Sequence, residues 1–192
     1  HCIGLFKIAE KTQNEIKTVY YNEDYFWVTF PDTLVPSVWS YDIESKIKTK
    51  IIDSAFIVSN IMNDEFVFLD IENQLCLFNV KSKAKTVLLS GVQSQFPEVF
   101  LSSTGKIVYW DKKNDYSFDL YIGTKANLKE KLVVSDLSML SYVAIYNNKK
   151  KLIYSTGDIN KSQLNGSLTI VDIASRKIES THSNVPWVDG IV

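Results

Sequence analysis

Short apolar runs alternate with short polar segments along most of the chain. The clearest example lies at 96–136, where four apolar runs stand at 99–101, 107–110, 120–122 and 132–134. Short apolar runs bounded by turn residues are typical of β-strands. We therefore expect this stretch to form a four-stranded antiparallel meander of about 40 residues.

The segment between the first two runs predicts a tight β-hairpin. It consists of small and polar residues around one glycine, Gly105, which can adopt a positive φ angle at low cost. The flanking runs at 99–101 and 107–110 are apolar at consecutive positions. A sheet with one wet face would alternate instead, so these strands are expected to be covered on both faces, as in stacked propeller blades.

Weaker copies of the meander precede and follow this stretch. We expect approximate units at 21–54, 55–93, 94–136 and 137–183, with partial units at 1–20 and 184–192. Residues 1–192 are then a single β-propeller-like domain or a fragment of a longer propeller. The fragment is favoured, because the two ends together leave a shared blade one strand short. A helix over 9–19 is the alternative for the N-terminal segment.

A short motif marks the end of the third strand in several units. It reads aromatic or apolar residue, Asp or Asn, β-branched residue, any residue, Ser and a basic residue. The motif occurs at 41–46, 78–83 and 171–176, and 122–124 holds the equivalent place. A short Asp or Asn side chain caps its own backbone in turns, so the motif predicts a structural turn. The spacing of about 40 residues lies within the range of propeller blades.

The 96–136 unit opens with proline, an aromatic residue, serine and Gly-Lys, and it closes with Asp-Leu-Tyr. In this it resembles the WD40-like repeat of TolB-type propellers, also found in the propellers of prolyl-oligopeptidase-like peptidases. The matching residues are Pro97, Phe100, Ser102, Gly105, Lys106, Ile107, Tyr109, Asp119, Leu120 and Tyr121. Ser103-Thr104 departs from the Pro-Asp that is usual there. The resemblance implies an all-β fold, a β-propeller or part of one with four-stranded antiparallel blades; a β-sandwich is the alternative.

Composition excludes several classes of function. The chain has 192 residues and a net charge of −1, so it lacks the basic excess that nucleic-acid binding requires. The one tight basic run, at 149–151, is interpreted as a solvated turn. No apolar run reaches the roughly 18 residues that a membrane span needs. The tyrosines and tryptophans on strands, including Trp39 and Trp110, are interpreted as core or inter-blade packing.

The two cysteines do not form a disulfide framework. Cys76 lies in an apolar run and is expected to be a small core residue. Cys2 raises the question of lipidation, but the residues after it resemble a strand rather than a polar tether. We expect an extracytoplasmic protein that is periplasmic, secreted or exposed at the surface.

The sequence contains no recognisable catalytic constellation. His182 lies in a polar segment near Ser183 and Asp189, but no G-x-S-x-G elbow is present, so we interpret it as a solvated loop residue. Asp111, Asp115 and Asp119 recur every fourth residue without the alternate spacing of a calcium loop. We therefore expect no catalytic residue, no metal site and no cofactor. Asn165-Gly166-Ser167 fits a glycosylation sequon but is read first as a turn.

We expect a non-catalytic binding or scaffold module that recognises a protein or another ligand through its blade loops. The alternative is a substrate-gating propeller domain of a larger, prolyl-oligopeptidase-like hydrolase. The longest polar insertions, at 112–117 and 156–166, are the expected recognition loops. The candidate residues in them are Lys112, Asn114, Asp115, Tyr116, Asp158, Asn160, Lys161 and Gln163.

Overall fold

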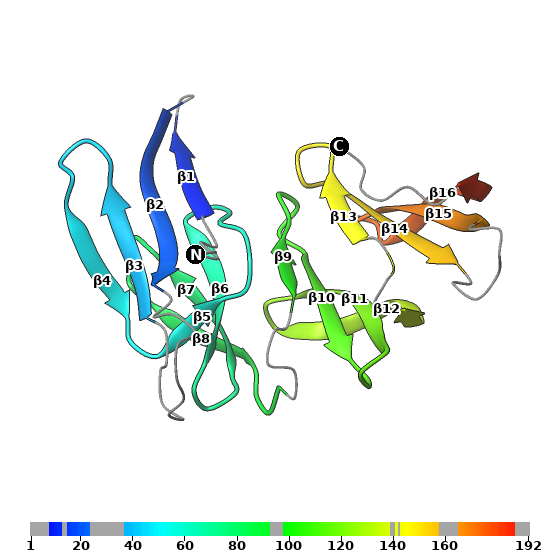
Figure 1. The fold of residues 1–192 in the computed structure, drawn as a ribbon, viewed down its shortest axis with the longest axis horizontal. Helices are drawn as coiled ribbons and strands as arrows, with labels where there is room; N and C mark the ends of the chain where they lie inside the picture. The colour runs from blue at the N-terminus through cyan, green and yellow to red at the C-terminus, as the bar shows by residue number, and fades with distance from the viewer. Residues whose placement is uncertain are drawn as a thin grey trace. The chain divides into compact units, whose positions relative to one another are not determined.

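A computed structural model describes residues 8–12, 15–23, 37–92, 98–138, 141, 143–157 and 165–186. The secondary structure in these ranges consists of β-strands, and the strands form four antiparallel sheets of four strands each (Figure 1). The strands of each sheet follow one another in chain order. The predicted all-β class and the four-stranded antiparallel sheets are confirmed, and this up-and-down order is the order of a propeller blade.

The first two sheets contain β1 (Ile8–Thr12), β2 (Glu15–Glu23), β3 (Ser37–Asp42) and β4 (Lys48–Ile52), and then β5 (Ala55–Ile57), β6 (Glu65–Asp70), β7 (Leu75–Asn79) and β8 (Lys85–Leu89). The next two contain β9 (Val99–Leu101), β10 (Ile107–Lys112), β11 (Ser117–Thr124) and β12 (Asn127–Ser138), and then β13 (Val143–Tyr146), β14 (Lys151–Gly157), β15 (Asn165–Asp172) and β16 (Lys177–Pro186). The chain divides into two compact units, His1–Val99 and Phe100–Val192.

The first unit has an apolar core rich in phenylalanine. The Phe66 ring lies 5.4 Å from the ring of Phe78 and 6.4 Å from that of Phe68, measured between centroids. Val38 of β3 belongs to the same buried cluster, as does Cys76. Cys76 is thus the core residue that its sequence context predicted, and burial raises the pKa of its thiol to about 11.

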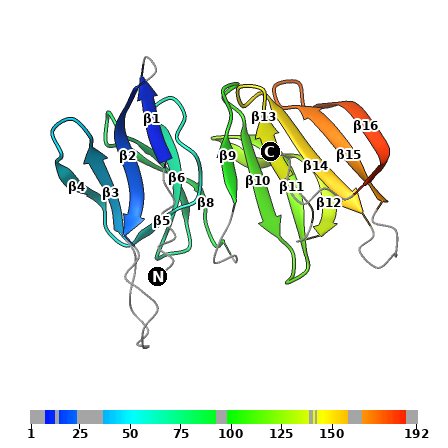
Figure 2. The ribbon, with the colours of Figure 1, turned by 45° about the horizontal axis from the view of Figure 1, so that its top comes forward.

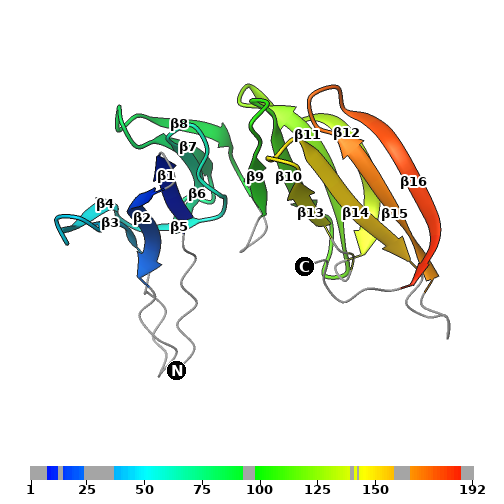
Figure 3. The same cartoon turned by 90° about the horizontal axis from the view of Figure 1, so that it is seen from above.

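The second unit has a core between two sheets. Val108, Trp110, Phe118, Leu120 and Ile122 of β10 and β11 pack against four buried side chains of the fourth sheet, three on β14 and β15 and one in the β15–β16 turn. Those four residues are Leu152, Tyr154, Val171 and Ile173. Figure 2 shows β10 and β11 (green) beside β13 and β14 (yellow), and Figure 3 shows β16 as the outermost strand of its sheet. Face-to-face packing of sheets, predicted from strands apolar on both faces, is therefore present.

Three predictions need correction: one about the N-terminal segment and two about the boundaries between units. The 9–19 segment is the strand pair β1–β2, so the helix alternative is wrong. The expected boundary between 1–20 and 21–54 falls inside β2, which pairs with β1 on one side and with β3 on the other. The expected boundary at 183–184 falls inside β16, whose Pro186 pairs with Asn165. In each case a strand continues through polar residues, because pairing with the neighbouring strand satisfies the hydrogen bonds of its backbone N–H and C=O groups.

The hairpin turn predicted around Gly105 is confirmed, and a second tight turn joins Met62 to Glu65. Gly105 has a φ angle of 78°, and the turn is closed by hydrogen bonds from the Gly105 amide to the Ser102 carbonyl and from the Ser102 amide to the Lys106 carbonyl. Asn63 and Asp64 both have positive φ angles, between Met62 and Glu65, which exchange two backbone hydrogen bonds. Left-handed Asn and Asp residues are typical of such two-residue turns.

The repeated third-strand motif is a turn with a shared hydrogen-bond pattern. A side-chain oxygen of Asp42, Asn79 or Asp172 accepts hydrogen bonds from the backbone amide and the hydroxyl of the serine three residues later. The basic residue that ends the motif has a left-handed backbone in every copy. Its φ angle is 58° at Lys46, 60° at Lys83 and 60° at Arg176. The motif is therefore structural, as predicted, and its basic residue terminates the turn.

The Asp172 turn makes a prediction about acid stability. The Lys151 ammonium and the Ser175 donors hold the pKa of the Asp172 carboxyl well below its ordinary value of 3.8. Because folding lowers this pKa, the stabilisation is present above pH 3.8 and is lost as the pH falls through the folded value. We expect unfolding experiments to show a smaller loss of stability below pH 4 for Asp172→Asn than for the parent protein.

Asn79 provides the reason for choosing asparagine, because it makes the same turn in the second sheet without a charge. The substitution therefore keeps the turn and removes the charge pair with Lys151. An acid unfolding profile identical to that of the parent would contradict the prediction. Lys151 itself belongs to β14 and pairs with both Asp172 and Glu179, so the expected solvated turn at 149–151 ends one residue earlier.

Candidate functional site

The first predicted recognition loop is the tip of the β10–β11 hairpin. Pairing of the two strands continues as far as Lys112 and Phe118, so the loop is shorter than the sequence suggested. The amides of Lys113 and Asn114 both donate to the carbonyl of Ser117, at 3.0 and 3.3 Å. These bonds close the loop, and only a few residues project from its end.

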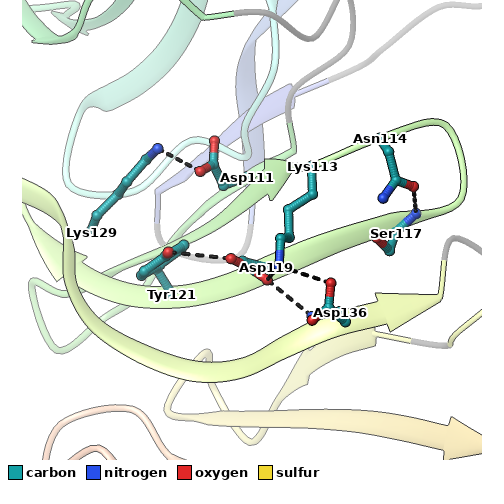
Figure 4. A network of polar contacts seen from close by, with 8 residues as sticks. All are labelled: Asp111, Lys113, Asn114, Ser117, Asp119, Tyr121, Lys129 and Asp136. Carbon is teal, nitrogen blue, oxygen red and sulfur yellow. Dashed lines mark hydrogen bonds and ion pairs between the residues drawn. The ribbon is translucent and has the colours of Figure 1, made fainter.

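The side chain of Asn114 fixes the conformation of this loop. Its Oδ1 atom accepts a hydrogen bond of 2.8 Å from the backbone amide of Tyr116. It accepts a second one, of 3.0 Å, from the backbone amide of Ser117 (Figure 4). This is an Asx turn, in which a side chain replaces a backbone acceptor. Lys112 and Asp115 add an ion pair of 2.9 Å, and the Lys112 ammonium lowers the pKa of the Asp115 carboxyl.

Tyr116 is the side chain that this turn presents to solvent. It is 83% exposed, the highest value among the large hydrophobic side chains of the described residues. An exposed aromatic ring on an ordered hairpin loses little conformational freedom when it is buried by a partner. Of the four candidates in this loop, Asn114 therefore holds the turn, Lys112 and Asp115 flank it, and Tyr116 projects into solvent.

A polar network beneath the loop anchors it to β12. The Lys113 ammonium lies 2.8 Å from Asp136 and 3.7 Å from Asp119. Asp119 also accepts a hydrogen bond of 3.0 Å from the Asp136 amide, where the backbone of β12 is left-handed (Figure 4). The hydrogen bond with Asp136 and the neighbouring Asp119 raise the pKa of Lys113.

The network continues along the same face of the sheet. Asp111 accepts a hydrogen bond from the hydroxyl of the buried Tyr109 at 3.1 Å. It also pairs with Lys129 (Figure 4). Burial, with the nearby Asp111 charge, raises the pKa of Tyr109 above its ordinary value. Tyr121 points toward Asp119. The opposite face of the sheet carries Trp110 and other residues of the buried cluster of the second unit.

The three regularly spaced aspartates do not converge. Asp111 pairs with Lys129, Asp115 with Lys112, and Asp119 with Lys113. Among the described residues, no group of three or more His, Cys, Asp or Glu side chains is arranged to hold a metal ion. Their lysine partners were not predicted from the sequence. The available signal was the alternation of polar residues with apolar ones at 117 and 119.

The second predicted loop is only partly described. β14 runs to Gly157 and β15 begins at Asn165, with Gly157 paired to Gly166, so the connection is shorter than 156–166. Asp158, Asn160, Lys161 and Gln163 lie outside the described residues. Asn165-Gly166 is the start of a strand, so its interpretation as a turn is wrong.

His182 and Ser183 lie in strand β16, so the expected loop at these residues is wrong. His182 pairs with Leu168 and is exposed. Asp189, the third residue considered for a catalytic set, lies outside the described residues. His182 is thus one of several consecutive exposed residues on the outer strand of the fourth sheet.

Solved structures with a similar fold include several β-propeller proteins. TolB from Acinetobacter baumannii matches with a TM-score of 0.53 and 14% identity over 90% of this chain and 42% of that chain. A prolyl endopeptidase matches with a TM-score of 0.66 and 12% identity over 96% of this chain and 27% of the other. Oligogalacturonate lyase from Vibrio parahaemolyticus matches with a TM-score of 0.55 and 12% identity over 92% of this chain and 52% of that chain. The fold is part of a β-propeller.

The chain spans between about a quarter and about half of the length of these proteins. No protein-family model matches the sequence. No curated protein matches it either. At these identities the likeness concerns the fold, and it confirms the resemblance to TolB-type and prolyl-oligopeptidase-type propellers at that level. The part of the chain that the structure describes contains no helix able to cross a bilayer.

Proposed function

We propose that this chain is a non-catalytic binding or scaffold module of β-propeller type that recognises a protein partner through its blade loops. The observation that carries the proposal is Tyr116, held in the open by the Asn114 turn and the Lys113 network. Large aromatic side chains on fixed supports are enriched among the residues that contribute most to protein–protein affinity. The charged pair Lys112–Asp115 then forms a polar border around this contact.

Replacing Tyr116 by serine is expected to weaken capture of the partner strongly. Loss of an aromatic anchor costs about 2 kcal/mol or more, which is roughly a 30-fold weaker complex. The measurement is quantitative mass spectrometry of proteins cross-linked to the tagged chain in its native cell. A matched control is Tyr146→Ser, because Tyr146 is an exposed tyrosine on β13 of the same unit. Identical sets of captured proteins for both variants and the parent would contradict the proposal.

A second reading is a substrate-gating propeller domain of a larger hydrolase. The observation in its favour is the match to a prolyl endopeptidase, in which 96% of this chain covers 27% of the enzyme. This reading predicts that the native reading frame also encodes an α/β-hydrolase segment with a G-x-S-x-G elbow. Sequencing of the complete frame decides it, since absence of such a segment removes the hydrolase reading and leaves the binding module.

We also propose that the protein works outside the cytoplasm, in the periplasm or at the cell surface, as its resemblance to TolB-type propellers implies. Fractionation of the native cells followed by detection of the tagged chain tests this location. Recovery of the protein only in the cytoplasmic fraction would contradict it, without affecting the binding role of the Tyr116 hairpin.

A further inference from the structure

The tip of the β10–β11 hairpin presents a carboxylate next to the exposed tyrosine. The side chain of Asp115 is 84% exposed. The next residue, Tyr116, is 83% exposed. Consecutive Cα atoms lie about 3.8 Å apart, so the carboxylate and the ring leave the backbone at neighbouring points. Because the Asn114 side chain holds this turn through the Tyr116 and Ser117 amides, a negative charge and an aromatic ring are displayed together on an ordered support.

The carboxylate of Asp115 is charged and accessible. Its Oδ1 atom accepts a hydrogen bond of 2.9 Å from the Lys112 ammonium, and this bond lowers the pKa of the carboxyl. The Lys112 side chain is only 38% exposed, so the carboxylate is the more accessible of the two charges. An exposed ion pair of this kind contributes little stability. A carboxylate also has lone pairs for several donors, so Asp115 can accept hydrogen bonds from a second cationic group.

The second lysine of the hairpin is directed away from this tip. The Lys113 ammonium contacts both Asp119 and Asp136 beneath the loop, so two carboxylates face one ammonium there (Figure 4). The hairpin and its support thus hold two lysines against three aspartates, a net charge of −1, from Lys112, Lys113, Asp115, Asp119 and Asp136. This balance favours a cation over an anion as the group bound at the tip.

We propose that Asp115 and Tyr116 together recognise an arginine side chain of the protein partner. This inference rests on the proposed function, because it assigns the chemistry of the group that Tyr116 contacts. A guanidinium is attracted to the face of a tyrosine ring by a cation–π interaction. Its N–H groups form a rigid fork that matches the two oxygens of a carboxylate. One arginine can therefore stack on Tyr116 and donate hydrogen bonds to Asp115 at the same time.

A lysine side chain fits these two groups less well. Its ammonium is a compact and strongly hydrated charge, whereas a guanidinium is planar and more weakly hydrated. Stacking on the ring therefore costs lysine more hydration, and lysine has no planar fork for two parallel hydrogen bonds. A preference for arginine over lysine thus separates this recognition from the general attraction between a cation and a carboxylate.

The test is an NMR titration of the isotope-labelled full chain with two short peptides at low ionic strength. The peptides have Gly-Ser flanks and differ only at the central residue, which is arginine in one and lysine in the other. The backbone amides of 114–117 should shift on addition of the arginine peptide. This peptide is expected to bind about two- to fivefold more tightly than the lysine peptide, the range of one exposed cation–π contact.

Three variants at the tip test the two contacts separately. Tyr116→Ser and Asp115→Asn should each weaken binding of the arginine peptide about two- to fivefold. Tyr116→Phe should leave it unchanged, because the ring is kept and only the hydroxyl is lost. These side chains are exposed, so the substitutions leave the core of the second unit intact.

The matched control for Asp115→Asn is Asp53→Asn. Asp53 also forms an exposed pair with a lysine three residues earlier, Lys50, at 3.0 Å, but its neighbours Ile52 and Ser54 are not aromatic. It removes the same charge and should leave binding unchanged. Lys112→Gln removes the competing ammonium from Asp115 and should tighten binding about twofold, whereas Lys50→Gln should have no effect.

Three results would overturn the inference: equal binding of the two peptides, equal effects of Asp115→Asn and Asp53→Asn, or no response of the 114–117 amides. Capture of proteins in the native cell tests the proposed function separately. If Tyr116→Ser loses captured proteins and Asp115→Asn does not, the binding role stands and recognition of arginine is wrong. If Tyr116→Ser captures the same proteins as the parent, the proposed function itself is contradicted.

Discussion

Replacing Phe66 by alanine is expected to lower the free energy of unfolding by about 3–5 kcal/mol, the usual cost of truncating a buried phenylalanine. Phe66 is fully buried in β6 and contacts the rings of Phe68 and Phe78. Its removal leaves a cavity in the core of the first unit, and strands on both sides limit how far the neighbouring side chains can collapse into it. Chemical denaturation followed by tryptophan fluorescence measures the change.

The matched control for this substitution is Val87→Ala in β8 of the same sheet. Val87 is 48% exposed, so its truncation removes less buried surface and leaves no closed cavity. A cost of about 0.5 kcal/mol or less is expected for such a surface position. If the two variants were equally stable, the phenylalanine cluster would not be the core of the first unit.

Replacing Gly123 by alanine is expected to cost about 3 kcal/mol or more through overpacking. A Cβ atom at this position would lie 2.3 Å from the carbonyl oxygens of both Asn127 and Leu128. These are backbone atoms of the β11–β12 hairpin, so no side-chain rotation can relieve the clash. The hairpin would have to open or shift, and thermal unfolding of the variant should show a clear loss of stability.

Gly105→Ala provides the comparison, because this glycine is needed for a different reason. Its φ angle is 78°, but a methyl group added at this position would meet nothing within 4 Å, so only the left-handed backbone is strained. That strain costs about 1–2 kcal/mol. The expected order is therefore a larger loss for Gly123→Ala than for Gly105→Ala, and the reverse order would contradict the close approach at Gly123.

Much of the fold follows from local patterns. The apolar runs at 107–110 and 120–122 predicted strands covered on both faces, and these runs lie in β10 and β11. The turns at Gly105 and Asp172 could be recognised from their residue types. A side-chain cap or a left-handed backbone depends on only a few neighbouring residues. These features could be predicted because their physical causes lie within one hairpin.

The candidate site was predicted in part. The loop that contains Tyr116 stood out as a polar insertion between strands, but its support did not. Lys113 is held by Asp119 and Asp136, which is 23 residues further along the chain. Trp39 was expected to be a packing residue; it is partly buried, and the ammonium groups of Lys48 and Lys50 over its ring were not predicted. Contacts between strands determine both arrangements.

Strand type, turn positions and the four-stranded repeat could all be predicted from the amino-acid sequence, since periodicity and turn residues act over a few positions. Three further features depend on tertiary contacts: which charges pair, where β2 and β16 end, and which aromatic side chains reach solvent. Strand register controls all three, because each residue's partner is selected by alignment across the sheet. A shift of one residue would turn Asp119 away from Lys113, although the pattern of apolar and polar residues would be unchanged.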